Sequence, residues 1–296
     1  MSVLGAVASS RTIGRTARDY ISLLKLRIVL LLDATAIGVM FPAAHGHPRL
    51  VAVAAVLVGG TLAAGGAHAI NCWFDRDIDA AMSRTRRRPL PDGRIPAWHA
   101  LALGIVLNVI AFGVLLAGAN LLAALLAMSG TLIYVCVYTM LLKRWSPQNI
   151  VIGGAAGAVP PLVGWAAATG GLDLTALALF AVIFFWTPPH FWALAQMIRK
   201  DYARASLPML PVMAEGSAKR QSVGYAACAA LASLVPFVTG SAGAVYFAGA
   251  AVLGIGLVAV TILDLNRSGG SRRVFAFSIL YVALLFTLFA ASPLLP

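Results

Sequence analysis

Charged side chains are scarce in this chain, and acidic ones are the scarcest. Only 11% of the 296 residues are charged, with 10 Asp and Glu against 22 Lys and Arg, whereas 60% are hydrophobic. A soluble domain carries about 25% charged residues, and a disordered chain is polar and poor in aliphatic residues. The composition therefore excludes both classes and indicates a protein that crosses a membrane several times.

Cysteines are also few, and a secretory signal is lacking. Cys72, Cys136 and Cys228 lie far apart, in or beside apolar runs, and form no CxxC motif. Their spacing excludes a disulfide framework or a zinc site, so we interpret them as small buried hydrophobic residues. Residues 1–25 have no long apolar core and are rich in Arg and Ser. We expect a basic cytoplasmic tail, too short for a convincing organelle transit peptide, which favours a bacterial inner (plasma) membrane.

Long apolar runs make up most of the chain. Because the hydrocarbon core of a bilayer is about 30 Å thick, a helix needs roughly 20 apolar residues to cross it. Nine runs are long enough, and they predict an all-α fold with one membrane domain over residues 1–296. They cover residues 27–44, 50–72, 98–118, 120–141, 149–169, 174–194, 222–240, 243–264 and 274–294.

The basic residues divide unevenly between the two sides of these nine spans. Alternating the loops places 21 Lys and Arg on one side and only Arg49 on the other. Basic loops stay in the cytoplasm, so the N-terminus is predicted to be cytoplasmic and the C-terminus to lie outside. The net charge of +12 thus reports membrane orientation and does not indicate a nucleic-acid partner.

Two long loops, residues 73–97 and 195–221, lie on the predicted cytoplasmic side, and long loops are usually functional. Asn71, Asp75 and Asp79 are spaced i, i+4, i+8 at the first of them, which puts them on one face of a helix. Carboxylates so placed can bind Mg²⁺. Asp77 points the other way and is expected to pair with a loop arginine. The alternative is an ordinary helix end in water, but acids there oppose the helix dipole.

Two further features extend this predicted site. Four arginines in five residues, Arg84 and Arg86 to Arg88, offer permanently charged donors for a diphosphate. In the second loop, His190, Met197 and Asp201 share one face if the helix continues through Pro188-Pro189. A lone intramembrane histidine is often structural, yet ionisable groups at such depth are candidates for function. Residues 208–211, Pro-Met-Leu-Pro, are expected to begin a lid over the site.

At these residues the chain resembles the UbiA-type intramembrane prenyltransferases. The shared pattern is Asn71-xxx-Asp75-xxx-Asp79, then Arg84-Thr85-xx-Arg88-Pro89-Leu90 and Gly93, while the strings WTPPHFWALA and LPMLP resemble the haem-modifying branch. The resemblance implies nine helices around a central cavity that opens at the cytoplasmic face. It implies Mg²⁺ as cofactor and a lipid bilayer, farnesyl diphosphate and haem B as partners.

The resemblance also assigns the site residues. The implied metal ligands are Asn71, Asp75, Asp79 and Asp201, and the catalytic set adds His190. The implied diphosphate contacts are Arg84, Arg88, Lys143, Arg199, Lys200 and Tyr138. The second aspartate motif of the family departs here, because His190 and Met197 stand where earlier members of that motif would be. His190 is expected to accept a proton during water addition or to contact the haem.

The reaction implied is transfer of a farnesyl group to a haem B vinyl carbon, with water addition, which gives haem O and diphosphate. A haem A synthase would then use the product. Two alternatives stay open. One is a relative that prenylates an aromatic quinone precursor or chlorophyllide. The other is a transporter, which would place its charges near the bilayer midplane in two related halves; no internal repeat supports it.

Overall fold

The computed structural model describes residues 15–266 and 271–295, so residues 1–14 of the predicted tail lie outside the described residues. Within these ranges the fold is all-helical, and nine helices are long and apolar enough to cross a membrane. They are α2 (Leu26–Ala43), α3 (Leu50–Phe74), α5 (Ala97–Gly118), α6 (Leu121–Leu132) continued by η1 (Ile133–Leu142), α7 (Asn149–Thr169), α8 (Leu174–Met197), α11 (Glu215–Ala232) followed by α12 (Val235–Val238), α13 (Ala244–Asp264), and α14 (Arg272–Ala291) followed by η2 (Ser292–Leu294). The nine predicted spans are confirmed.

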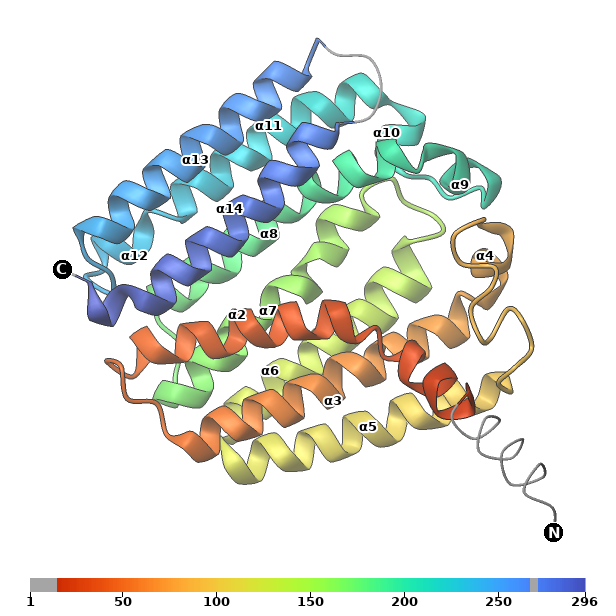
Figure 1. The fold of residues 1–296 in the computed structure, drawn as a ribbon, viewed down its shortest axis with the longest axis horizontal. Helices are drawn as coiled ribbons and strands as arrows, with labels where there is room; N and C mark the ends of the chain where they lie inside the picture. Colours follow the sequence, from red (N-terminus) through yellow and green to blue (C-terminus); the bar gives the residue numbers. More distant parts are fainter. Residues whose placement is uncertain (1–14, 267–270, 296) are drawn as a thin grey trace, which may run out of the picture.

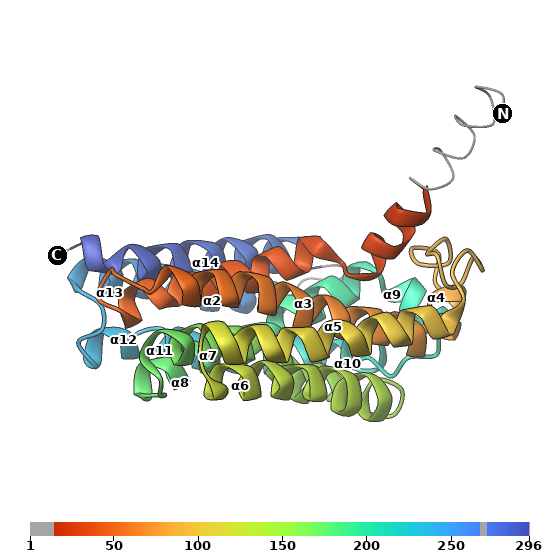
Figure 2. The same ribbon diagram turned by 90° about the horizontal axis from the view of Figure 1, so that it is seen from below.

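The long helices run side by side along the molecule (Figure 1). Seen from below, they form two layers, with α2 and α14 in one and α6 and α8 in the other (Figure 2). Three short helices, α4 (Arg76–Ala81), α9 (Arg199–Arg204) and α10 (Leu210–Met213), gather at one end of the bundle. We call this the charged end. The last described residues lie at the opposite end (Figure 1), as an odd number of spans requires.

Small residues let the helices approach closely. A Cβ atom on Gly164 of α7 would lie only 1.9 Å from the Ala36 carbonyl oxygen of α2. In a membrane, helices associate through such close van der Waals packing because lipid tails are as apolar as the side chains they replace. Large buried side chains fill the space between α8, α13 and α14; they include Leu179, Tyr246, Leu257, Tyr281, Leu285 and Phe289.

Both predicted loops contain short helices, and most of the second is helical. The second span extends to Phe74 and is followed by α4, while α9 and α10 occupy much of residues 195–221. The seventh span begins at Glu215, seven residues before its predicted start at 222. Its first turns escape a hydropathy scan because they are polar. The buried Lys219 there lies 3.2 Å from Glu215 and 3.8 Å from Asp264, so its charge is compensated inside the protein.

The predicted common face of His190, Met197 and Asp201 is wrong. Helix α8 does continue through Pro188 and Pro189, but it ends at Met197, and Asp201 belongs to α9. Ile198, with φ −113° and ψ 28°, breaks the helix between them. Met197 is consequently exposed whereas Asp201 is buried.

The segment expected to begin a lid packs into the charged end. Met209 and Leu210 are buried in one cluster with Ile78 and Met82, which belong to the first loop, and with Trp192 of α8. The second loop therefore covers the first, although whether it opens during function stays a prediction.

Candidate active site

Asn71, Asp75 and Asp79 form a continuous row where α3 ends and α4 begins. The Asp75 amide donates to the Asn71 carbonyl (2.9 Å) and the Asp79 amide donates to the Asp75 carbonyl (2.8 Å), so the helical spacing persists across the junction. All three residues are buried: Asn71 is 4% exposed, Asp75 1% and Asp79 5%. An ordinary helix end in water is therefore excluded.

Basic groups from distant elements neutralise this row. Lys143 donates to Asp75, and Arg88 Nη1 donates to both oxygens of Asp79, at 2.8 and 3.0 Å. Lys25 Nζ donates to Asn71 Oδ1 at 2.9 Å, and its burial lowers the pKa of Lys25 below the ordinary lysine value. The unfavourable interaction of these acids with the helix dipole is thus compensated by three cations.

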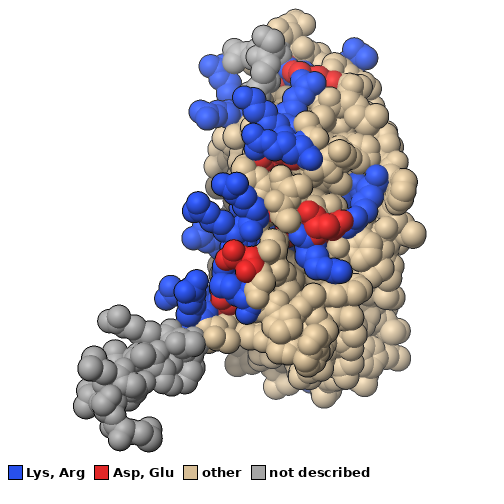
Figure 3. Space-filling model, turned by 90° about the vertical axis from the view of Figure 1, so that its right-hand side faces the viewer, with Lys and Arg blue, Asp and Glu red and all other residues tan. Residues whose placement is uncertain are grey.

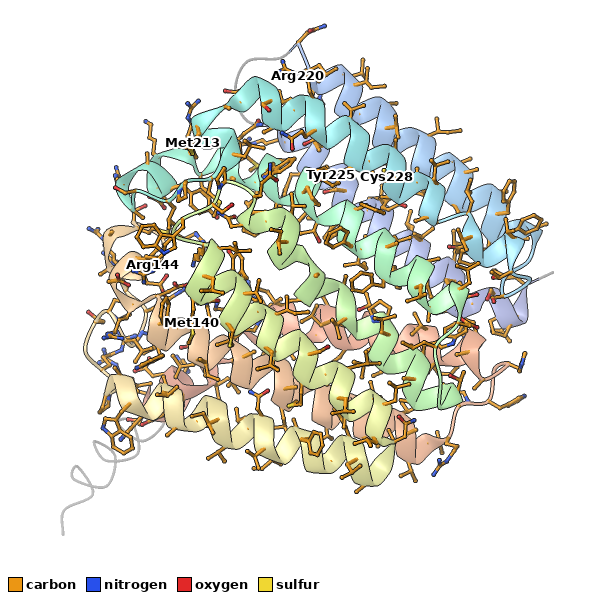
Figure 4. All side chains as sticks on the ribbon, turned by 180° about the vertical axis from the view of Figure 1, so that it is seen from behind. Met140, Arg144, Met213, Arg220, Tyr225 and Cys228 are labelled. Carbon is orange, nitrogen blue, oxygen red and sulfur yellow. The ribbon has the colours of Figure 1, made fainter. Side chains whose placement is uncertain are left out.

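Asp77 lies on the opposite, exposed side, as predicted. Both of its oxygens accept hydrogen bonds from Arg144, at 2.7 and 2.8 Å, and these bonds hold the pKa of Asp77 below its usual value. Arg144 follows η1 and is labelled in Figure 4. Asp75 and Asp79, four positions apart, therefore face the interior. Asp77, between them, forms an ion pair with Arg144 at the surface.

The second half of the fourth span, η1, is a π-helix, which the sequence did not lead us to expect. Helices of this kind are rare and occur frequently at functional sites. It carries Tyr138, whose ring lies 5.9 Å below Lys143 Nζ, and Thr139, whose hydroxyl accepts from the Asn71 amide group at 3.1 Å. The Tyr134 and Tyr138 rings stack with centroids 5.7 Å apart. The π-helix thereby presents an aromatic and polar surface to the aspartate row.

Asp201 joins the second loop to the first. Its Oδ1 atom accepts from the Ser83 hydroxyl at 2.7 Å and from Arg204 at 3.3 Å. The hydrogen bond from Ser83 lowers the pKa of Asp201, so this carboxylate is ionised at neutral pH. The contact brings together residues 118 positions apart and anchors α9 beside α4.

The remaining predicted site residues, all within the described part of the chain, form no hydrogen bond or ion pair with the aspartate row. Arg84 and Lys200 are exposed. Arg199 is exposed too and pairs with Glu215 at 3.3 Å, so its contact is with α11. His190 lies deeper in α8, stacked between the rings of Trp186 and Phe275 at 4.3 and 4.9 Å. Its Nδ1 atom is 2.8 Å from Ser278 Oγ.

The aspartate row suits a hard divalent cation. Among the described residues, no three His, Cys, Asp or Glu side chains converge on one point as they would around a bound metal. The buried Asp75 Oδ1 atom, however, has no hydrogen-bond partner among the residues that the structure describes. A buried acceptor left without a partner is costly, and carboxylate and amide oxygens are the donors that Mg²⁺ takes. The residues present therefore fit Mg²⁺.

A cavity of about 180 Å³ adjoins the row. Asp79 and Arg88 line it together with Cys72, Leu23 and Leu90. The space therefore has one charged wall and one apolar wall, an arrangement suited to a ligand with a charged head and an apolar tail.

Three residues near the row were not among the predicted site residues. Lys25 was noted in the basic tail and in Lys25-Leu26-Arg27, which resembles a Lys-Pro-Arg motif of the family, but it was given no role in the site. Thr139 and His68 were not singled out. His68 is buried one helical turn before Asn71, and its Nδ1 atom lies 3.2 Å from Tyr134 Oη. A histidine three residues before the first member of the motif was the signal available in the sequence.

Lys and Arg side chains gather over the charged end, around a few acidic ones (Figure 3). The site thus lies beneath a basic surface at one end of an apolar bundle. Such a surface attracts anions.

The profile of the UbiA prenyltransferase family matches residues 32–292. The chain belongs to this family. It is 52% identical to a protoheme IX farnesyltransferase of Roseiflexus sp. over 93% of its length, and 51% identical to one of Gloeobacter violaceus over 90%. The chain covers 89% of the Gloeobacter protein. It spans only about half the length of the Roseiflexus sp. relative (52%) and of a second one from Roseiflexus castenholzii (51%).

Solved structures of UbiA-type proteins share the fold. A digeranylgeranylglyceryl phosphate synthase superposes with a TM-score of 0.80 over 94% of this chain and 99% of its own, at 17% identity. A UbiA homologue from Archaeoglobus fulgidus, bound to DMAPP and Mg²⁺, superposes with a TM-score of 0.67 over 94% of this chain and 100% of its own, also at 17% identity. At this identity the likeness concerns the fold alone.

Proposed function

We propose that this chain transfers a farnesyl group from farnesyl diphosphate to a vinyl carbon of haem B, with addition of water, to give haem O and diphosphate. The observation that carries the proposal is the buried row Asn71, Asp75 and Asp79 with cations on each member. The relatives named protoheme IX farnesyltransferase, at about half identity over most of the chain, support haem B as the acceptor.

The row and its cations would bind the diphosphate head. Asn71, Asp75 and Asp79 would hold Mg²⁺, with Asp201 as a further ligand from the second loop. When bound, the metal ion neutralises the diphosphate and stabilises it as a leaving group. The A. fulgidus homologue bound to DMAPP and Mg²⁺ supports this assignment.

The chain's own cations would assist departure of the diphosphate. Arg88 and Lys143 lie on the row and can turn from carboxylate to phosphate oxygens, with Tyr138 beneath the lysine. Donors already aimed at the charge that develops stabilise the transition state at little cost in reorganisation. The exposed Arg84, Arg199 and Lys200 would draw the anion toward the site from the charged end.

His190 would contact the acceptor. Its ring is held between Trp186 and Phe275, and its Nδ1 atom is bonded to Ser278. Flat aromatic surfaces of this kind suit a planar macrocycle. Of the two roles expected for His190, we propose this one, contact with the acceptor.

The membrane setting is also a proposal. The basic charged end would face the cytoplasm, and the protein would reside in a bacterial inner membrane. A haem A synthase would receive the product.

The test uses membranes that contain the full chain, supplied with haem B, farnesyl diphosphate and Mg²⁺. Extracted haem is separated by chromatography and identified by mass. We expect farnesylated, hydrated haem, and its formation should stop with EDTA and resume with added Mg²⁺. Unchanged haem, from protein shown to be folded, would contradict haem as acceptor, and aromatic acids or chlorophyllide would be assayed next.

A matched pair of variants tests the aspartate row. Asp79→Asn should lower turnover by about 100-fold or more, because metal-assisted departure of the diphosphate needs that carboxylate. Asp77→Asn removes the same charge two residues away, on the exposed side, and should retain most activity. Equal activity of the two variants would contradict the assignment.

A further inference from the structure

His68 is a buried histidine with one ring nitrogen available. The residue is 7% exposed, and the ring packs edge-on against Tyr134, with centroids 5.2 Å apart. Nδ1 lies 3.2 Å from Tyr134 Oη. Nε2 is buried and lacks a hydrogen-bond partner among the described residues.

His68 lies deeper in the bundle than the aspartate row, on the same helix. His68 precedes Asn71 by three residues and Asp75 by seven, so all three lie toward one side of α3, and His68 is about 10 Å deeper than Asp75. Cys72, four residues after His68, lines the cavity next to Asp79 and Arg88. Farnesyl C1 is bonded to a diphosphate oxygen, so a ligand whose head lies on the row keeps C1 beside the row. An acceptor that meets C1 from within the bundle then lies between the row and the depth of His68.

An unpartnered buried nitrogen at this depth points to a polar ligand. A buried polar group without a partner costs free energy. His99, in the other His–Tyr pair, bonds to Tyr20 through Nδ1, just as His68 bonds to Tyr134, so it is the buried Nε2 of His68 that needs a further ligand. A water molecule is the smallest ligand that could bond to His68 Nε2.

We propose that His68 Nε2 binds the water that adds to the acceptor and takes its proton. The proposal rests on the proposed function. In this proposal Nδ1 carries the ring proton and donates it in the hydrogen bond to Tyr134 Oη, so Nε2 has a free lone pair. Tyr134 is then a positioning residue, since it fixes the orientation of the imidazole.

The bond between farnesyl C1 and the diphosphate oxygen breaks, and the electron pair leaves with diphosphate. The vinyl π electrons form the new bond to C1, which leaves a cation on the vinyl carbon next to the macrocycle. The water oxygen bonds to that carbon, and its proton passes to His68 Nε2. Without a water held and deprotonated at His68, the cation would instead lose a proton from the adjacent methylene to the departed diphosphate and give an alkene.

The test compares products of the full chain with His68→Gln, whose amide can bond to water but cannot take its proton. We expect farnesylation to continue while the ratio of hydrated to alkene haem falls at least about tenfold, since a positioned base contributes about 100-fold or more. Tyr134→Phe should lower the ratio less. His99→Gln, at the other His–Tyr pair, is the control and should leave the ratio unchanged.

Further outcomes decide the proposal. An unchanged product ratio in His68→Gln would overturn it, and so would loss of every product with binding of a farnesyl diphosphate analogue intact, because His68 would then act before the cation forms. If His68→Gln fails to fold, as judged by its melting temperature in detergent, His68→Asn is assayed in its place. Failure of the unsubstituted chain to farnesylate haem would instead contradict the proposed function.

Discussion

The pair of Arg88 and Asp79 illustrates how an ion pair in the row would serve ligand binding more than stability. One guanidinium nitrogen contacts both carboxylate oxygens, and Asp79 is almost completely buried. The desolvation penalty of burying two charges can exceed their mutual attraction. A pair that adds little to folding is nevertheless well placed to act on a ligand that brings its own charges.

Replacing Arg88 should weaken binding of the prenyl donor. We expect Arg88→Met to raise the Kd of a non-hydrolysable farnesyl diphosphate analogue by at least about 30-fold, or about 2 kcal/mol, because truncating one partner of a buried charge pair costs about 2–5 kcal/mol. Titration calorimetry in detergent measures it.

Arg86→Met is the matched control, because Arg86 is exposed two residues earlier in the same run. A similar loss of affinity in both variants would show that the arginines act only through the overall basic charge of the loop.

At the scale of elements, two devices shape the site. The π-helix η1 sets Tyr138, Thr139 and Lys143 toward the aspartate row. Gly153 of α7 makes room for it, since a Cβ there would lie 2.4 Å from the Tyr138 ring. The positions of the helices and the geometry of the site are therefore coupled.

Close packing of α2 against α7 should depend on Gly164. In Gly164→Ala the new methyl group would overlap the Ala36 carbonyl, and overpacking costs about 1–3 kcal/mol or more. We expect a lower melting temperature in detergent. Gly157→Ala, on the same helix with open space around it, should melt like the unsubstituted chain, and equal destabilisation of the two would refute the packing argument.

At the scale of the whole molecule, the orientation in the membrane can be measured. Single cysteines at Arg86 and His47 probe opposite ends of the bundle, once Cys72, Cys136 and Cys228 are replaced. In intact cells a membrane-impermeant maleimide should label the variant with cysteine at position 47 and should reach position 86 only after the membrane is opened. The reverse labelling would invert the proposed topology.

The spans and the aspartate row could be predicted because both depend on local periodicity. Nine apolar runs set the helices, and the four-residue spacing of Asn71, Asp75 and Asp79 set their common face. The end of α8 at Met197 was missed because Ile198 is apolar and gives no sign of a break. Lys143 was assigned to the site only through the family resemblance, and Lys25 and Thr139 were missed, because these residues lie 46 to 68 positions from the residues they contact.

The pairing of every buried aspartate in the row with a cation has a consequence for how a ligand is admitted. Metal and diphosphate carry opposite charges, as do the side chains that would receive them. Under the proposed function, binding would be an exchange of partners: Asp75 and Asp79, now paired with Lys143 and Arg88, would hold the metal, and the two cations would hold the phosphate oxygens. No charge need be left alone in the apolar bundle before, during or after the exchange.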